Sequence, residues 1–213
     1  TEMQLSAARY ANPLTQLPGN VPINEHVDRM LTAGTSFVTA YIDIDNFKPY
    51  NDTFGYRRGD DVILLLAQLL REAVDKRHDF IGHIGGDDFF VVFQSADWEQ
   101  RCWSLVQSFA ASVAAMSSSQ DEALGGYMAE NRRGEYVFQR FPTLSVGAVR
   151  IFPGQCESHR EVAAAAVEAK KQAKKEAKRA QTPPLQGNVF IERRLVGGGV
   201  MGERFLQAGR VAS

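Results

Sequence analysis

The sequence predicts an α/β fold, in the form of an α+β sandwich of strands and helices. Short runs rich in β-branched and aromatic residues, such as residues 36–45 and 143–152, alternate with longer segments of helical character. Two further apolar runs, at residues 80–84 and 89–93, flank a Gly-Gly-Asp-Asp sequence, which is the signal of a β-hairpin. With 213 residues, of which 44% are hydrophobic, the chain fits one domain of ordinary size or one domain with an extension.

Composition and charge argue against several classes of partner. The net charge is −1, so we expect no nucleic-acid partner, and any phosphate-binding surface must be local. Cys102 and Cys156 form no CxxC pair, which argues against a zinc site or a disulfide scaffold and fits a reducing cytosol. No apolar run reaches the roughly 18 residues of a membrane span. Because the chain does not begin with Met, we expect it to be a piece of a longer protein.

The first elements follow from turn residues and apolar patterns. Residues 1–22 form a turn-rich linker, and residues 23–31 a short helix. Residues 36–45 predict a central strand. Pro49 limits the next helix to a start near residue 48, because proline fits the first turn. From Asp60 onward, an apolar segment predicts a buried helix.

The later elements include an insertion and a final helix. We expect a helix at 97–116, an irregular polar insertion at about 117–140, an Ala- and Lys-rich helix at 159–180 and a last strand at 188–195. Together these predict one domain over residues 23–195, followed by a C-terminal tail at 196–213.

Four aspartates are candidates for chemistry. Asp43 and Asp45 lie two apart at the end of a predicted strand, so both side chains would share one face. Asp87 and Asp88 lie in the predicted hairpin tip. If the hairpin packs beside the strand, the carboxylates converge and need a cation, and Mg²⁺ suits oxygen ligands shared with substrate phosphates. The alternative is that Asp87 and Asp88 are ordinary turn residues.

Several motifs in order resemble the GGDEF family of diguanylate cyclases over residues 10–180. They are "NPLTQLPGN", "YIDIDNFKPYNDTFGYRRGDDVI", "IGHIGGDDFFVVF", "TLSVGAV" and "AKKEAK". The "GHIGGDDF" wording and the insertion are similar to variant GGDEF domains found beside EAL phosphodiesterase and CBS domains. The resemblance implies a palm-like nucleotidyl-cyclase fold with a central, mostly antiparallel sheet. It also implies condensation of two GTP into cyclic di-GMP and pyrophosphate by a homodimer in the bacterial cytoplasm, with Mg²⁺ or Mn²⁺.

The resemblance also implies roles for individual residues. Asp43, the Ile44 carbonyl and Asp87 match the metal ligands, and Asp87 also matches the base for the ribose 3′-hydroxyl. Lys48 matches a lysine that steadies phosphate charge, and Asp88 belongs to the same catalytic motif.

Substrate recognition is implied for a second set. Asn51 and Asp60 match the pair that reads guanine, since an amide and a carboxylate complement its acceptor and donors. The amides of Asn46 and Phe47 match those that cradle phosphate at a helix start. Tyr56 stands in this set where histidine is common in the family.

The terminal helix supplies further phosphate contacts in the family. Lys174 corresponds to a motif lysine, and Lys178 falls where an arginine usually follows. Here that helix reads "AVEAKKQAK" in place of the family's ADxALYxAK. Lys76 and Asp79 fall at the family's inhibitory RxxD site, and a lysine cannot reproduce the bidentate fork of arginine.

Two functions remain open from the sequence. Asp88 replaces the usual glutamate and retracts the carboxylate by roughly 1.5 Å, which favours a GTP-binding regulatory module without turnover that controls an attached domain. The intact matches at Asp43, Asp87 and Lys48 favour an active cyclase. If the shortened Asp88 works, we expect neighbours such as His83 and Lys48 to have adapted to it.

Overall fold

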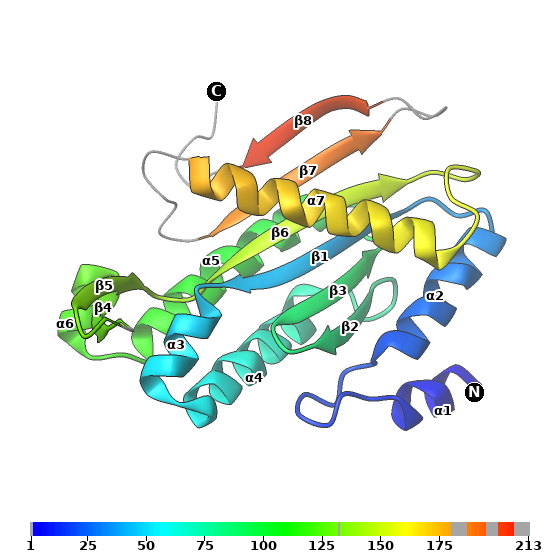
Figure 1. Ribbon diagram of the computed structural model, residues 1–213. Coiled ribbons are helices and arrows are strands. Elements are labelled where there is room, and N and C mark those ends of the chain that lie inside the picture. The colour runs from blue at the N-terminus through cyan, green and yellow to red at the C-terminus, as the bar shows by residue number, and fades with distance from the viewer. Residues whose placement is uncertain (1, 132, 180–186, 195–199, 207–213) are drawn as a thin grey trace.

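A six-stranded sheet forms the centre of the computed structural model, which describes residues 2–131, 133–179, 187–194 and 200–206. The strand order is β2-β3-β1-β6-β7-β8 (Figure 1). These strands are β1 (Phe37–Asp45), β2 (Phe80–Gly85), β3 (Asp88–Phe93), β6 (Thr143–Ile151), β7 (Asn188–Arg194) and β8 (Val200–Leu206). Strands β6 and β7 pair in parallel, and the other neighbours in this sheet pair antiparallel. The predicted central, mostly antiparallel sheet is therefore confirmed.

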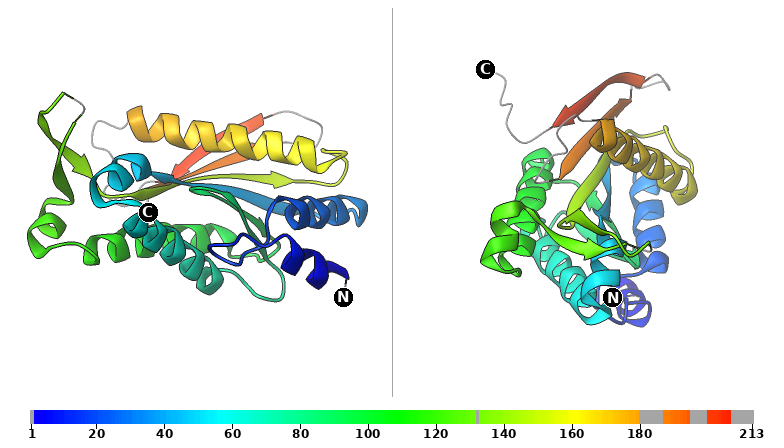
Figure 2. Two further views of the ribbon diagram at one scale, coloured as in Figure 1. Left: turned by 60° about the horizontal axis from the view of Figure 1, so that its bottom comes forward. Right: turned by 60° about the vertical axis from the view of Figure 1, so that its left-hand side comes forward.

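Helices cover both faces of the sheet (Figure 2). On one face, α4 (Tyr56–Ala73) and α5 (Trp98–Ala115) pack against the larger apolar core. On the other, α2 (Asn20–Thr32) and α7 (His159–Arg179) enclose a second core. Helix α1 (Glu2–Arg9) precedes α2, and the short α3 (Phe47–Phe54) follows β1. The predicted sandwich is thus a sheet between two layers of helices.

Strand β1 is buried on both sides, and its alternation decides which residues reach α7. Val38, Ala40 and Ile42 belong to the core beneath α4 and α5. Phe37 and Tyr41 belong to the core on the α2 and α7 side. Because side chains alternate along a strand, Asp43 and Asp45 continue the α7-facing series.

Gly147 in β6 lets α7 approach the sheet closely. A Cβ atom built at this position would lie 2.2 Å from the backbone nitrogen of Lys170 and 2.3 Å from the carbonyl carbon of Ala169. Any larger residue would push the helix away from the sheet. Gly147 pairs with Tyr41 across β1 and β6, so the closest approach lies beside the strand that carries Asp43.

The insertion is ordered, which corrects the expectation of an irregular segment. It contains α6 (Ser119–Leu124) and a hairpin of β4 (Gly126–Glu130) and β5 (Tyr136–Arg140). The Ser118 hydroxyl caps α6, and Gly125 ends it with φ 69°. Tyr127 anchors the hairpin to α3, with its ring 4.7 Å from that of Phe54. Burial of this aromatic residue stabilises a strand that the polar composition concealed.

Other boundaries also differ from the sequence-based expectations. Helix α4 begins at Tyr56, four residues earlier than Asp60, because Gly55 with φ 84° separates it from α3. The predicted linker contains α1 and the start of α2, and the predicted tail contains β8. No helix within the described ranges combines the length and apolar character needed to cross a membrane.

Candidate active site

The hairpin places Asp88 directly beside the end of β1. Gly85 pairs with Asp88, so Gly86 and Asp87 alone form the turn, and Asp88 is the first residue of β3. This corrects the expectation that both aspartates lie in the tip. Gly86 has φ 56°, a conformation that favours glycine. Asp88 pairs with Asp43 across the antiparallel strands, and paired residues point to the same face.

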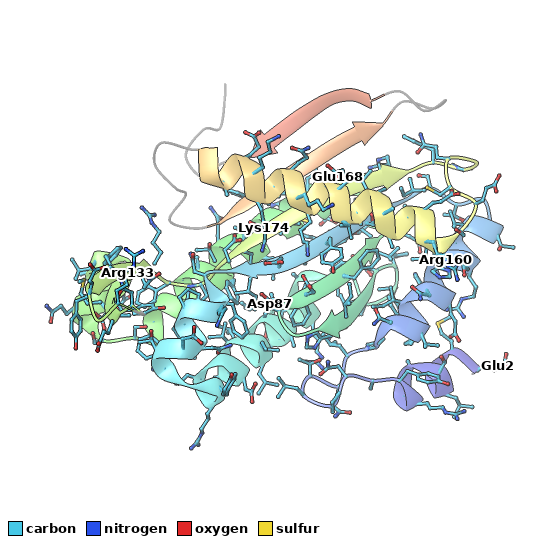
Figure 3. The ribbon with its side chains drawn as sticks, viewed as in Figure 1. Glu2, Asp87, Arg133, Arg160, Glu168 and Lys174 are labelled. Carbon is cyan, nitrogen blue, oxygen red and sulfur yellow. The ribbon has the colours of Figure 1, made fainter. Side chains whose placement is uncertain are left out.

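Two lysines on successive turns of α7, Lys170 and Lys174, meet these carboxylates, and Figure 3 labels Lys174 on that helix. Lys170 Nζ lies 3.0 Å from Asp88 Oδ1 and 3.4 Å from Asp43 Oδ2. Lys174 Nζ contacts Asp43 Oδ1 and lies 3.8 Å from Asp45 Oδ1. The convergence of carboxylates that the sequence predicted is therefore present, and ammonium groups neutralise it.

Burial and charge shift the ionisation of this cluster in opposite ways. Burial raises the pKa of Asp43, and the nearby Asp87 raises it too, while the hydrogen bond and charge of Lys174 lower it; the net shift is upward. Burial lowers the pKa of Lys170, but its hydrogen bond to Asp88 and the charges around it outweigh burial and raise it. Lys170 therefore stays charged.

The buried side chain of His83 supports the hairpin turn. Its ring is buried, stacks on Phe89 at 4.2 Å and hydrogen-bonds through Nε2 to the Gly86 carbonyl at 3.0 Å. Nδ1 lies 2.9 Å from the Thr15 hydroxyl, which donates to it when Nε2 carries the proton. Burial lowers the pKa of His83, which favours this neutral form. His83 supports the turn, and among the described residues the side chain that hydrogen-bonds to Asp88 is that of Lys170.

The start of α3 lies next to the end of β1. Asn46 adopts a left-handed conformation with φ 58° and is the N-cap residue of α3, so the amides of Asn46 and Phe47 lie at the start of the helix. Lys48 is 73% exposed and pairs with Asp52 at 3.0 Å on the same helix. The ammonium of Lys48 is thus held apart from the carboxylate cluster in the described structure.

The residues expected to read guanine lie at the junction of α3 and α4. Asn51 packs over Gly59, where an added Cβ would lie 1.7 Å from Asn51 Oδ1. Within the described ranges, this oxygen is buried and has no hydrogen-bond partner. Asp60 is exposed, and Tyr56 is 82% exposed. One end of the candidate site is therefore open to solvent.

The oxygen atoms of the expected metal ligands are donors of the type that Mg²⁺ binds. Asp43, Asp87 and the Ile44 carbonyl are hard oxygen donors, which Mg²⁺ prefers. Among the described residues, no group of three or more acidic, histidine or cysteine side chains is arranged to hold a metal.

Comparison with known proteins shows the family of the chain. The family model described as "Diguanylate cyclase, GGDEF domain" matches residues 10–180. The chain belongs to the GGDEF family. This GGDEF domain is 32% identical over 140 residues to the protein named diguanylate cyclase DgcP of Pseudomonas aeruginosa, a match that covers 61% of the chain and 21% of that protein. The chain therefore spans about a fifth of the length of this relative.

Solved structures confirm the fold of this GGDEF domain. The coiled coil and GGDEF domain of DgcB from Caulobacter crescentus, in complex with c-di-GMP, matches with a TM-score of 0.58 at 23% identity, covering 81% of this chain and 84% of that one. Diguanylate cyclase SiaD of Pseudomonas aeruginosa, in complex with its activator SiaC, matches with a TM-score of 0.59 at 23% identity, covering 82% and 62%.

Asp79 of this GGDEF domain, expected at the family's inhibitory site, has a structural task. Asp79 accepts hydrogen bonds from the backbone amides of Asp75, Gln94 and Ser95 and from the Ser95 hydroxyl, at 2.8–3.0 Å. These bonds close the loop between α4 and β2 onto the end of β3. The carboxylate is therefore occupied within the fold.

Sequence reasoning missed Lys170 in this GGDEF domain. Its signal was the repeat of Ala-Lys at positions 169–170 and 173–174, because residues four apart share one helix face. The side chain of Lys178, also expected at the site, lies outside the described residues.

Proposed function

We propose that this domain is a Mg²⁺-dependent diguanylate cyclase that condenses two GTP molecules into cyclic di-GMP. The observation that carries the proposal is the meeting of Asp43, Asp88, Lys170 and Lys174 at the end of β1, beside the first turn of α3. Such a cluster provides acidic oxygens for a hard cation and ammonium groups for phosphates. The backbone amides at the start of α3 would supply a second phosphate contact.

The reaction joins nucleotides held on two domains. The 3′-oxygen of each GTP attacks the α-phosphorus of the other, a P–O bond forms, and the bond to the β-phosphate breaks with release of pyrophosphate. The Asp87 carboxylate accepts the proton of the hydroxyl. Bound Mg²⁺ would polarise phosphate oxygens and help ionise the hydroxyl. Because each domain presents one GTP, two copies must face each other antiparallel.

Substrate recognition divides between two ends of the site. Asn51 and Asp60 would pair with the guanine edge, with Tyr56 beside them. Lys48, Lys174, Lys178 and the amides of Asn46 and Phe47 would bind the phosphates. Lys174 now pairs with Asp43 and Asp45, and it would exchange these partners when a triphosphate arrives.

The test is product formation from GTP with Mg²⁺ or Mn²⁺ at high protein concentration, because two domains must meet. Cyclic di-GMP from the wild type and its loss in Asp87→Asn would support the proposal. Turnover that survives unchanged in Asp87→Asn would overturn the assignment of the base.

A second function is favoured by the state of Asp88. Its carboxyl is one bond shorter than the family's glutamate, and Lys170 binds it at 3.0 Å. A domain arranged in this way could bind GTP without turnover and control an attached domain, such as an EAL domain in a bacterial cytoplasmic protein. GTP binding without product from the wild type would favour this function. In either case we propose that the domain, expected at residues 23–195, also includes the start of α2 at Asn20 and strand β8 (Val200–Leu206).

A further inference from the structure

Lys170 places a resident positive charge inside the carboxylate cluster. Its ammonium lies between Asp88 at 3.0 Å and Asp43 at 3.4 Å, and it lies 4.1 Å from the centroid of the Tyr41 ring. The side chain is only 16% exposed. An aromatic face and two carboxylates together surround a cation with negative potential.

The position of this ammonium is imposed by packing. Gly147 allows the backbone of α7 to approach the sheet at Lys170, so the side chain enters beside Tyr41 and reaches the carboxylates. Lys174, one turn later, engages the other oxygen of Asp43. Both oxygens of Asp43, the candidate metal ligand, are therefore occupied by ammonium groups.

We propose that Lys170 is a positioning residue that fills the cation site before substrate arrives, so that a divalent ion enters with the nucleotide and not alone. A divalent ion near Asp43 must overcome repulsion from Lys170 or displace it. The phosphates of GTP supply negative charge that offsets this repulsion and can receive the ammonium groups. Metal and nucleotide are then coupled ligands, each of which strengthens binding of the other.

This inference rests on the proposed metal-dependent function, but its test needs no turnover. The probe is Mn²⁺, counted as free ion by electron paramagnetic resonance during titration of the whole chain. Titrations run without nucleotide and with 3′-deoxy-GTP, which lacks the attacking hydroxyl. The variants are Lys170→Met and Lys170→Gln, which both remove the charge, and two variants allow for a failure of one to fold.

The expected effect of removing the Lys170 charge on Mn²⁺ affinity differs between the titrations without and with nucleotide. Without nucleotide, both variants should bind Mn²⁺ at least about 10-fold more tightly than the wild type, because a like charge has gone. With 3′-deoxy-GTP present, the difference should shrink. Mn²⁺ should also raise the melting temperature of the variants more than that of the wild type. The matched control is Lys171→Met, because Lys171 is 67% exposed and pairs with Glu168 on the helix surface; it should behave as the wild type.

The site of any gain is checked with Asp43→Asn in the Lys170→Met background, which should abolish the tighter binding. Equal Mn²⁺ affinity in the wild type and both charge-removing variants would overturn the inference while leaving the metal site intact. A gain that persists without Asp43 would also overturn it. Absence of Mn²⁺ binding in every protein, with nucleotide present, would remove the proposed metal site and this inference together.

Discussion

The two ends of the candidate site are built in opposite ways. The carboxylate end draws Asp43 from β1, Asp88 from β3 and Lys170 from α7, and these side chains are largely buried and ion-paired. The other end is called the base end, after the guanine base that it is proposed to bind. It takes Asn51 and Asp60 from consecutive helices, and the charged residue, Asp60, is exposed. The first end is held together by ion pairs within the fold, whereas in the second the carboxylate of Asp60 stays solvated.

Solvation explains the difference. A carboxylate buried away from water is costly unless a partner compensates it, so the fold brings two ammonium groups to Asp43. An exposed carboxylate such as Asp60 keeps its water and needs no partner within the fold. Changes at the carboxylate end should therefore alter both catalysis and metal binding, and changes at the base end should alter selectivity.

The largest effect is expected from Asp43→Asn. Loss of a metal-binding charge should lower cyclic di-GMP formation by at least about 100-fold. Folding should survive, because burial raises the pKa of Asp43 and a neutral amide is tolerated there. Product formation and thermal melting measure the two properties. Glu168→Gln, on the exposed face of α7, is the matched control and should keep full activity. Undiminished turnover in Asp43→Asn would show that the buried end is structural only.

The next effect concerns the base end. Asp60→Ala should reduce the preference for GTP over ATP by roughly 10-fold or more, because a site built to pair with one base edge leaves groups unpaired with another. Asn51→Ala should act in the same direction. Calorimetric titration of both nucleotides measures the preference. Equal affinity of the wild type for GTP and ATP would mean that these residues do not read guanine.

Asp88→Glu tests whether the carboxylate end has adapted to a short side chain. If Lys170 has adapted the site to Asp88, its ammonium can follow a longer acid, and turnover should change by less than about 10-fold in either direction. That is well below the roughly 100-fold expected of an uncompensated misplacement. The comparison uses wild type and variant at equal, high protein concentration. A rise of two orders of magnitude would identify Asp88 as the single lesion. No product from either protein, with GTP still bound, would establish the regulatory function.

The smallest functional effect is expected at Asp79, away from both ends. Binding of cyclic di-GMP should be weak in the wild type, because Lys76 replaces arginine and the Asp79 carboxylate already holds four donors. Asp79→Ala should destabilise the fold by about 1–3 kcal/mol while leaving the weak binding unchanged. Urea denaturation and titration with cyclic di-GMP measure the two. A submicromolar site that disappears in Asp79→Ala would contradict this reading of the loop.

The sequence alone determined the local elements whose signals lie within one segment. Alternation in β1 fixed the shared face of Asp43 and Asp45, and the Gly-Gly-Asp-Asp sequence between two apolar runs indicated the hairpin. Ordered motifs gave the family. The same local reading failed for the insertion, because burial of Tyr127 against α3 is a contact between segments far apart in the chain.

Only the tertiary structure decided how charge is balanced at the site. Asp88 and Lys170 are 82 positions apart, and their meeting depends on the pairing of β1 with β3 and on the close approach of α7 at Gly147. In the sequence of α7, Lys170 is one lysine among several in a polar segment. Its distinct role arises because packing removes water from one face of α7, and a charge on that face must then find a partner within the fold.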